Sequence, residues 1–468
     1  MIFPRNQTIN IFAAAAREYR IFPGCPRTEP MNTRQIAEQA EQASKLSAAL
    51  PSETKNRALR EISAALKAAR EEIFRANRRD LERSEAEGLA PPLLKRLKFQ
   101  EEKLDETLKG LDALVDIPDP VGEVLASREL APGLELHKLR CPIGVIAMIF
   151  ESRPDAAVQI ASLGLKSGNA VLLKGGSEAR ETLEVLNRVM HDAAVSAGLP
   201  RGWLGQLTSR EDVTQLLDMD ELVDLIIPRG SNEFVRHIMD NSSIPVMGHA
   251  DGICHVYVDA QADPRMAESV CVDSKTQYVA VCNAMETLLI HKDAARRMLP
   301  DICRALQEKN VELRGCSAAR ELVPEMKEAV EEDWSSEYLD YILSIKIVDS
   351  LEQAVEHINA YGSGHTDSII TGDSAAALQF MNSVDTASAL WNCSTRFADG
   401  FRYGLGAEVG ISTNKIHARG PVGMEGLTIY QWRLFGQGQI VEDFASGKSS
   451  FTHKPLSTER YGFSQNER

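Results

Sequence analysis

The sequence predicts an α/β protein with doubly wound parallel sheets, and three observations lead to this prediction. The chain has 468 residues, more than one hydrophobic core usually holds, so two or three domains are expected. From Pro142, short apolar runs alternate with longer amphipathic runs, which is the pattern of strand–helix–strand units. A second alternation of the same kind begins after about Asp259. Ligand sites in such sheets are expected at the carboxyl ends of the strands.

The composition is that of an ordinary folded protein and limits the classes of partner. Hydrophobic residues make up 43% of the chain, charged residues 25%, and the formal net charge is −15. This acidic balance argues against a general binder of nucleic acid or anionic membranes, because such proteins need basic surface. A few arginines could still hold a small anionic substrate. No apolar run approaches the length of a membrane span.

Cysteine and histidine usage predicts free thiols and offers no metal motif. The eight cysteines include no Cys-x-x-Cys pair, and the chain shows no secretory signal with a clean apolar core. The histidines form no His-Glu-x-x-His or similar spacing. We therefore expect a cytoplasmic protein that has neither disulfides nor a bound metal.

The N-terminal part of the chain divides into an extension and a helical region. Residues 1–30 lack the helical pattern that begins after Met31 and are expected to be a disordered extension or the product of an upstream start. Residues 33–114 are expected to be mostly helical, and Ser52 is the expected N-cap of one helix. Around Pro132-Gly133, two alternating halves predict a β-hairpin, either a surface loop or an arm that reaches a partner subunit.

The first alternating region is expected to form a parallel sheet. Its predicted strands are PIGVIAMIF, NAVLLKGG, LVDLIIPRG and IPVMGH. Its predicted helices cover residues 155–165, 177–198 and 231–242. The turns KGGSEAR and PRGSNEF each end a buried strand and open a helix, so their amides and Lys174 could hold an anion. The simpler interpretation is a plain connection with a serine cap. GLGAEVG, from Gly404, is a poor dinucleotide fingerprint and is expected to be a tight loop.

The second alternating region carries the residue that raises the question of function. It includes ETLLIH, YILSIKIVD, DSIITG and ASALWN with helices between them, and the tail after Phe444 is expected to be loose. Cys282 stands in VAVC, where a cysteine could be a buried packing residue, a metal ligand or disulfide half, or a reactive thiolate. NAMETLL after it is helix-like, so helical amides and Asn283 could hold an oxyanion. His365, in a Gly/Ser loop, could contact substrate or be solvated.

Four long motifs resemble one enzyme family. They are VCNAMETLL, AVEHINAYGSGHTDSII, IGVIAMIFESRPDA and STRFADGFRYGLGAEVGISTNKIHARGPVGMEGLTIYQW. These segments resemble the glutamate-5-semialdehyde dehydrogenase family, also called gamma-glutamyl phosphate reductases, of the aldehyde dehydrogenase superfamily. The similarity runs from about Met31 to Gly438 in the family's order. It implies an aldehyde dehydrogenase-like fold, in which Cys282 is the catalytic cysteine.

The wider superfamily resemblance implies a set of cofactor-binding residues. LLKGGSEA resembles the segment whose lysine meets the adenosine ribose, which implies this role for Lys174. RGSNEFV resembles the turn near the cofactor pyrophosphate, which implicates Gly230 and Ser231. Glu337 resembles the glutamate that meets the nicotinamide ribose. The family implies NADPH as the cofactor, although no residue here decides between NADPH and NADH.

Two departures from the superfamily pattern stand out. Hydrolytic aldehyde dehydrogenases carry a glutamate base in a segment that here reads VMGHADG, without a glutamate. An enzyme without that base should exchange its acyl group with phosphate rather than hydrolyse a thioester. Tyr278-Val279 replaces the Arg-Pro of many bacterial relatives, and nothing in the sequence explains that change.

The resemblance implies a substrate and a chemistry. The enzyme would reduce L-glutamyl 5-phosphate to L-glutamate 5-semialdehyde and phosphate, the second step of proline synthesis from glutamate. The Cys282 thiolate would form a thioester, with the Cys282 amide and the Asn283 region stabilising the oxyanions. Arg153, Arg396 and Arg402 are the candidates for holding the substrate's phosphate or carboxylate, and each could instead be a structural ion pair.

The resemblance also implies how the chain is divided and with what it associates. The arm is expected to extend a neighbour's sheet in a homo-oligomer, and the enzyme that makes the acyl phosphate, a glutamate 5-kinase, is expected to be a separate chain. A hydrolytic aldehyde dehydrogenase and a non-catalytic cofactor-binding relative are the alternative functions. The expected division is an NADP-binding domain at 31–117 and 142–258, an oligomerisation arm at 118–141 and 425–441, a catalytic domain at 259–424 and a polar tail at 442–468.

Overall fold

The computed structural model describes residues 31–151, 153–249 and 251–459, so the predicted extension at 1–30 lies outside the described residues. The N-terminal region is helical, as predicted. Helix α3 starts at Ser52, but Pro51 occupies the cap position and no side chain caps the helix, so the predicted serine cap is wrong. These helices are α2 (Thr33–Ser47), α3 (Ser52–Ala68), α4 (Arg70–Ala86), α5 (Pro91–Leu97) and α6 (Glu101–Asp116).

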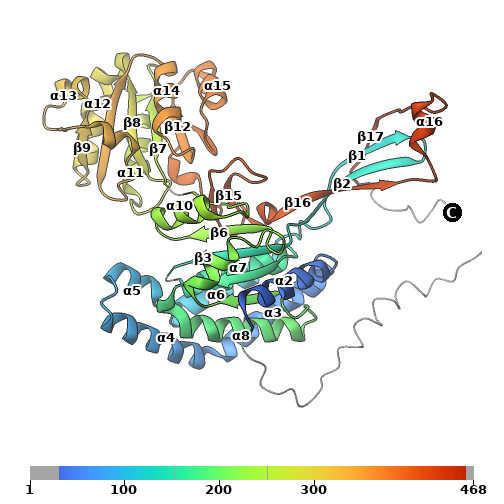
Figure 1. Ribbon diagram of the computed structural model, residues 1–468. Helices are drawn as coiled ribbons and strands as arrows, with labels where there is room; N and C mark the ends of the chain where they lie inside the picture. Colours follow the sequence, from blue (N-terminus) through green and yellow to red (C-terminus); the bar gives the residue numbers. More distant parts are fainter. Residues whose placement is uncertain (1–30, 152, 250, 460–468) are drawn as a thin grey trace, which may run out of the picture.

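The first sheet has four parallel strands in the order β5-β4-β3-β6, with helices on both faces (Figure 1). The predicted strand IPVMGH is wrong, because Val246 forms only an isolated bridge to Ile226. The short strand β5 was not predicted. The elements are β3 (Val145–Phe150), α7 (Pro154–Lys166), β4 (Ala170–Lys174), α8 (Arg180–Ser196), β5 (Leu204–Leu207), α9 (Arg210–Leu216), β6 (Leu225–Arg229) and α10 (Asn232–Asn241).

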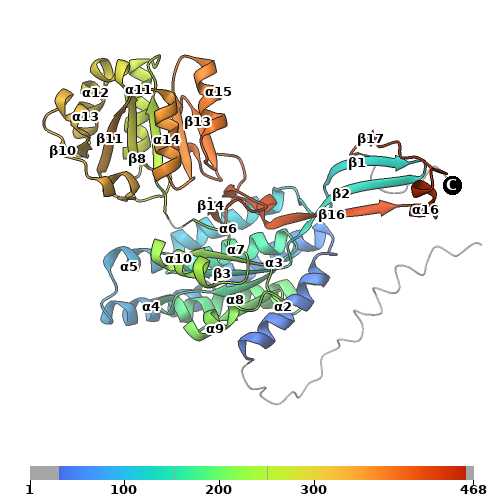
Figure 2. The ribbon, with the colours of Figure 1, turned by 45° about the horizontal axis from the view of Figure 1, so that its top comes forward.

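The second sheet has seven parallel strands in the order β10-β9-β11-β8-β7-β12-β13 (Figure 2). ETLLIH lies in the buried strand β8, as the alternation predicted, so the helix-like interpretation of NAMETLL after Cys282 is wrong, because a short apolar run has the same pattern in both. The strands are β7 (Cys254–Val258), β8 (Met285–His291), β9 (Glu312–Gly315), β10 (Lys327–Glu328), β11 (Ile342–Val348), β12 (Thr366–Ile370) and β13 (Ser388–Trp391). The helices are α11 (Pro264–Thr276), α12 (Lys292–Gln307), α13 (Ser317–Leu322), α14 (Leu351–Tyr361) and α15 (Ser374–Ser383).

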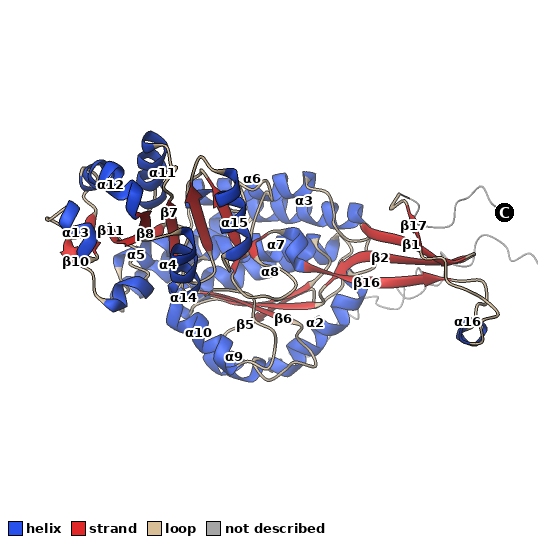
Figure 3. Ribbon diagram, turned by 90° about the horizontal axis from the view of Figure 1, so that it is seen from above, coloured by secondary structure: helices blue, strands red, loops and turns tan. Residues whose placement is uncertain are grey.

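A third, antiparallel sheet projects away from the other two as an arm (Figure 3). Its strand order is β16-β2-β1-β17, and β16 pairs with β2 along its whole length. The tail is not wholly loose, because β17 pairs with β1. Gly133 turns the hairpin with a φ of 72°. The elements are β1 (Val124–Ala131), β2 (Leu134–Pro142), β16 (Thr428–Phe435), α16 (Val441–Ala445) and β17 (Lys454–Leu456).

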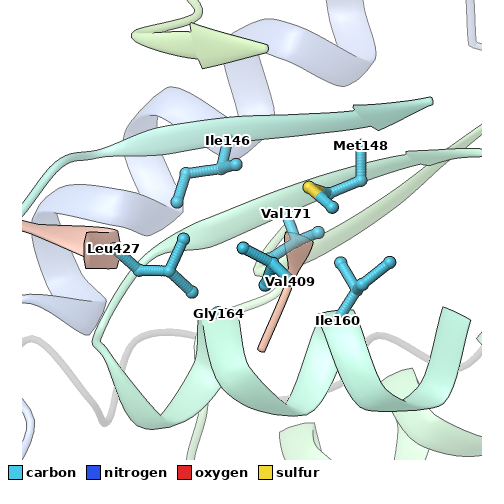
Figure 4. A pocket seen from close by; sticks show the side chains of 7 residues that line it. All are labelled: Ile146, Met148, Ile160, Gly164, Val171, Val409 and Leu427. Atoms are coloured by element: carbon cyan, nitrogen blue, oxygen red, sulfur yellow. The ribbon is translucent and has the colours of Figure 1, made fainter. Parts of the chain in front are cut away.

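The segment that leads back to the arm packs on the first sheet. Figure 4 shows side chains of β3, β4 and α7 meeting two residues of this segment, Val409 and Leu427. Helix α7 lies so close to β4 that a Cβ on Gly164 would be 2.2 Å from Cγ2 of Val171. The segment also holds a two-stranded ribbon of β14 (Gly410–Ser412) and β15 (Gly420–Val422). Among the described residues, no helix combines the length and apolarity that crossing a bilayer requires.

Candidate active site

Cys282 lies in the loop between α11 and β8, close to the first residues of β7. A Cβ on Gly252 would lie 2.3 Å from the carbonyl oxygen of Cys282, so only a glycine lets the two backbones approach this closely. The thiol of Cys254 donates to that same carbonyl oxygen at 3.1 Å. Cys282 therefore has a fixed backbone position at the amino ends of strands β7 and β8, not at the carboxyl ends that the sequence led us to expect.

His365 is the nearest titratable neighbour of the thiol. Its ring is fully buried, and its Nε2 lies 3.1 Å from Sγ of Cys282. Its Nδ1 lies 2.9 Å from Oγ1 of Thr366, the first residue of β12. The interpretation of His365 as a solvated loop residue is therefore wrong. With Nδ1–H donating to the threonine oxygen, Nε2 is left as an acceptor for the thiol proton.

His249 was not singled out by sequence reasoning, although it stands in the segment that lacks the glutamate. Its ring lies 5.0 Å from that of His365, centroid to centroid, and its Nδ1 lies 2.8 Å from the carbonyl oxygen of Ile411. Because a carbonyl only accepts, Nδ1 carries the proton and Nε2 keeps its lone pair. Burial, the largest cause, lowers the pKa of His249, so the ring is neutral.

Arg229 is a second residue that the sequence analysis missed. It ends strand β6, directly before the Gly230-Ser231 turn, and burial lowers the pKa of its guanidinium. Its charge in turn lowers the pKa of the Cys282 thiol. A Cβ on Gly410 would lie only 2.5 Å from Nη1 of Arg229, so the guanidinium occupies the space beside this glycine. A basic residue at the end of a buried strand, next to a candidate anion-binding turn, was the signal that could have identified it.

The electrostatics of the site favour a neutral thiol over the expected thiolate. Burial raises the pKa of Cys282 to about 12, opposed by Arg229 and reinforced by Glu337 and Glu408. Burial also lowers the pKa of His365 well below its ordinary value. A helix N-terminus is not available to stabilise a thiolate, because β8 follows the cysteine. Attack by sulfur therefore requires a base, and His365 is within reach.

Asn283 holds the cysteine loop in place. Its Nδ2 donates to the carbonyl oxygen of Ala398 at 2.9 Å, and its Oδ1 is buried without a partner among the described residues. Directly flanking this loop, Lys275 of α11 and Glu286 of β8 form a fully buried ion pair with Nζ and Oε2 2.6 Å apart. The loop is thus tied down on both sides by buried polar contacts, which fix where the sulfur lies.

The three candidate arginines do not form one group. Arg396 is nearly buried, and its Nε donates to Oε1 of Gln277 at 2.9 Å. Arg402 lies beside it, with Nη1 donating to the carbonyl oxygen of Arg396 at 3.1 Å. The charge of a Cys282 thiolate would raise the pKa of Arg396, so Arg396 is within electrostatic reach of the sulfur. Arg153 is half-exposed, and its charge acts on Arg229 instead.

The candidate cofactor residues gather at the carboxyl ends of β4 and β6. Lys174 ends β4, and burial lowers the pKa of its ammonium, which donates to the Gly175 carbonyl at 2.8 Å. Ser231 caps α10, and a Cβ on Gly230 would lie 2.8 Å from the Glu151 carboxylate. This turn has no room for a side chain, and its amides suit an anion such as a cofactor phosphate, since that of Ser231 already donates to the Glu151 carboxylate at 3.2 Å.

Glu337 connects the candidate cofactor residues with the site around Cys282. Its Oε2 accepts from Nδ2 of Asn232, the first residue of α10, at 2.6 Å, and burial raises its pKa. Its charge also raises the pKa of Cys282, so this carboxylate is bonded to α10 and acts electrostatically on the sulfur. The carboxyl edge of the first sheet therefore faces the amino edge of the second, with a nucleophile, a base and candidate anion-binding groups between them.

Comparison with known proteins places the chain in a well-defined group. The model of the aldehyde dehydrogenase family matches residues 7–318. The gamma-glutamyl phosphate reductase of Acetivibrio thermocellus is 58% identical over 91% of this chain and 99% of its own length. That of Pelotomaculum thermopropionicum is 57% identical over 92% and 99%.

Solved structures agree with these sequence matches. The crystal structure of the Thermotoga maritima gamma-glutamyl phosphate reductase matches with a TM-score of 0.86 and 37% identity, covering 88% of this chain and all of the other. An acetylating aldehyde dehydrogenase from Geobacillus thermoglucosidasius matches with a TM-score of 0.59 over 87% of this chain and 97% of its own. At 19% identity, this second match shows the fold alone.

Proposed function

Because the chain belongs to the gamma-glutamyl phosphate reductase family, a branch of the aldehyde dehydrogenases, we propose that it reduces L-glutamyl 5-phosphate to L-glutamate 5-semialdehyde and phosphate in proline synthesis. The observation that carries the mechanism is the contact of 3.1 Å between Sγ of Cys282 and Nε2 of His365. It supports a nucleophile with its own base, in a site that also carries cationic groups for an anionic substrate.

The first half-reaction makes a thioester. His365 Nε2 takes the thiol proton as Sγ of Cys282 attacks the acyl phosphate carbonyl. The tetrahedral intermediate collapses with loss of phosphate, and the acyl group stays on sulfur while the proton stays on His365. Thr366 supports this role, because its Oγ1 lies 2.9 Å from Nδ1 and can accept from Nδ1–H, which leaves the lone pair on Nε2.

The second half-reaction releases the aldehyde. When bound, NADPH supplies the hydride that reduces the thioester carbonyl. Sulfur then leaves from the resulting thiohemiacetal, and His365 returns its proton, which restores the neutral pair. Arg229 stabilises the negative charge that develops near sulfur in both halves, since its charge already favours the thiolate form of Cys282. The Cys282 amide is the proposed donor to the oxyanions, whereas the Asn283 side chain holds the loop.

The remaining site residues have proposed binding roles. Arg396 and Arg402 hold the substrate's phosphate or carboxylate near the sulfur, and Arg153 contributes from the side of Arg229. For NADPH, the proposal assigns the ribose and pyrophosphate contacts to Lys174, Gly230, Ser231 and Glu337. The family, rather than any residue of this site, supports the preference for NADPH over NADH.

We also propose a cytoplasmic homo-oligomer built through the arm. Strand β16 lies at the edge of the arm sheet and carries exposed apolar side chains such as Trp432 and Leu434, which suits pairing with a second copy. A separate glutamate 5-kinase would supply the labile substrate. Association of the kinase with this protein is tested by cross-linking the two purified proteins. The absence of a cross-linked product at micromolar concentrations would contradict it.

The function is tested in the reverse direction, because glutamyl phosphate is labile. Glutamate semialdehyde and NADP are mixed with and without inorganic phosphate while NADPH absorbance is followed. We expect phosphate-dependent reduction of NADP that Cys282→Ser abolishes and that Cys316→Ser, a control at another partly exposed cysteine, retains. Turnover without phosphate would identify a hydrolytic dehydrogenase, and no turnover with NADP or NAD would indicate a non-catalytic relative.

A further inference from the structure

The reaction centre holds the ligand set of a metal site, although no spacing in the sequence indicates one. Cys282, His249 and His365 each offer one ligand atom, and these three atoms lie within 4.8 Å of one another. No other group of three histidine, cysteine or acidic side chains this close occurs at 31–151, 153–249 or 251–459. The three residues are far apart in the chain and meet only where the two parallel sheets face each other.

The ligand types select the class of metal. One thiolate and two imidazoles suit a borderline-soft divalent cation, and zinc is the common biological example. Zinc binds sulfur at about 2.3 Å and nitrogen at about 2.0–2.1 Å, so its ligand atoms stand on the order of 3.5 Å apart in a tetrahedron. Sγ of Cys282 and Nε2 of His365 are already 3.1 Å apart. Small side-chain movements would complete three corners and leave the fourth for solvent.

Both histidines have a hydrogen-bond partner at Nδ1 that suits the form that binds a metal. Nδ1 of His249 donates to the Ile411 carbonyl at 2.8 Å, and Nδ1 of His365 lies 2.9 Å from Oγ1 of Thr366. In metal sites, such a bond from the second ring nitrogen sets the tautomer and orients the ring. The carbonyl leaves the lone pair on Nε2 of His249, and the Thr366 hydroxyl, by accepting from Nδ1, does the same for His365. Cys282 and His249 are only partly buried, which gives an ion a route to the ligands.

The charges around the cluster also admit a cation. Glu337 and Glu408 both act on Cys282 as negative charges. Arg229 acts as a positive charge on the same sulfur and on His249, and Arg396 interacts electrostatically with the sulfur. Displacement of the thiol proton adds a third negative charge at the point of binding. Three negative charges then face these two guanidinium groups, so a cation bound to the deprotonated sulfur has carboxylates to offset its charge.

We propose that Cys282, His249 and His365 form a reversible inhibitory site for zinc. Binding replaces the thiol proton with a sulfur–zinc bond and releases that proton to solvent. The sulfur that must attack the acyl phosphate is then occupied, and Nε2 of His365 is no longer free to accept a proton. The inhibitory effect rests on the proposed role of Cys282, whereas the binding itself does not.

Binding is measured first, on tag-free protein freed of metal by a chelator. Cobalt(II) serves as the spectroscopic probe, since a cysteine thiolate bound to it gives a charge-transfer band and a tetrahedral site gives intense visible bands. We expect both signals, their loss on adding one equivalent of zinc, and protection of Cys282 from iodoacetamide that a chelator reverses. Zinc should inhibit turnover over the same concentration range.

Variants separate this site from adventitious binding. His249→Asn keeps a donor for the Ile411 carbonyl but removes the ligating nitrogen, so zinc affinity should fall by at least about tenfold. His365→Asn should do the same, and Cys282→Ser should lose the charge-transfer band. His191→Asn, at a surface histidine of α8 that contacts Asp192, should leave binding unchanged.

Failure of the proposed zinc site and failure of the proposed enzymatic function would give different results. Absence of the charge-transfer band in the wild-type protein, or equal zinc affinity in the wild-type protein and His249→Asn, would overturn the metal site, whatever the activity. Tight zinc binding in a protein that turns over no substrate would leave the metal site intact and overturn the proposed function.

Discussion

At the reaction centre, polar side chains are buried, whereas on the arm, apolar side chains face solvent. His365, Lys275 and Glu286 have no exposed surface, yet each has a polar partner within 3.1 Å. On β16, Trp432 and Leu434 are 54% and 56% exposed and cover no part of the described chain's core. In most folded proteins apolar side chains are buried and polar side chains are exposed. Both regions show the reverse, so folding alone favours neither arrangement.

The difference between the two regions indicates the functions proposed for them: the reaction centre stabilises charge, and the arm binds another molecule. Buried polar groups that have partners within the chain create a dry, preorganised site, where a charge that develops is strongly stabilised. The apolar side chains on the edge strand stay about half exposed although Trp432 contacts Tyr430 and Lys138, so a large apolar surface is left for a partner from outside. Substitutions in the first region should therefore change chemistry and stability, and those in the second should change assembly.

The largest effect is expected at His365. His365→Ala removes the base within reach of the thiol, so kcat/KM in the phosphate-dependent reaction should fall by about 10²- to 10⁴-fold. Steady-state kinetics on the variant checks this. His191→Ala, at a surface histidine, should keep full activity. A loss of less than about tenfold in His365→Ala would contradict the role of His365 as base.

The second-largest effect is expected at the buried ion pair of Lys275 and Glu286, where breaking the pair should lower the stability of the fold. Lys275→Met leaves the Glu286 carboxylate buried and unpaired, and should lower the free energy of unfolding by about 3–5 kcal/mol in urea denaturation. The double variant Lys275→Met, Glu286→Leu should recover most of that loss, since no charge remains to desolvate. Equal losses in the single and double variants would show that packing, not the unpaired charge, controls the stability.

An arm substitution should act on assembly instead. Trp432→Glu puts a charge in the middle of the proposed interface, so association should weaken by at least about 2 kcal/mol, measured as molar mass against concentration by light scattering. Leu378→Glu, at an exposed apolar residue of α15, is the matched control and should leave the mass unchanged. A wild-type protein that is monomeric at all concentrations would rule out the arm as an oligomer interface.

The smallest effect concerns the orientation of the base. Thr366→Val removes the Oγ1 that accepts from Nδ1 of His365, which should lower kcat/KM by a factor equivalent to about 0.5–1.5 kcal/mol. Thr287→Val is the matched control, because the Thr287 hydroxyl on β8 is buried without a partner among the described residues. It should leave activity unchanged. If both variants lose activity equally, the loss reflects packing in the sheet.

Parts of the site could be predicted from sequence because they follow strands. Gly230 and Ser231 follow the buried strand β6, as the pattern indicated, and Lys174 ends β4 at the same carboxyl edge of the first sheet. At Cys282 the same reasoning failed. The apolar residues after it suit a helix and a buried strand equally, and the pattern could not show that the second sheet presents its amino edge to the site.

Other site residues gave too weak a local signal. His249 and Arg229 stand in segments that the analysis quoted, but neither type nor spacing distinguished them from ordinary polar residues. Burial is what gives them their properties, since it keeps the His249 ring neutral and brings the charge of Arg229 to bear on a thiol. Burial is set by packing between elements that are distant in the chain.

By itself, the sequence determined the two alternating halves, the hairpin and the family, because strand and helix periodicity and long motifs are local properties that the chain carries in any conformation. The tertiary structure alone decided that His249, Cys282 and His365 meet and that the thiol is held neutral. The physical reason is that distances between remote residues, and the desolvation that shifts their pKa values, arise only when the carboxyl edge of one sheet packs against the amino edge of the other.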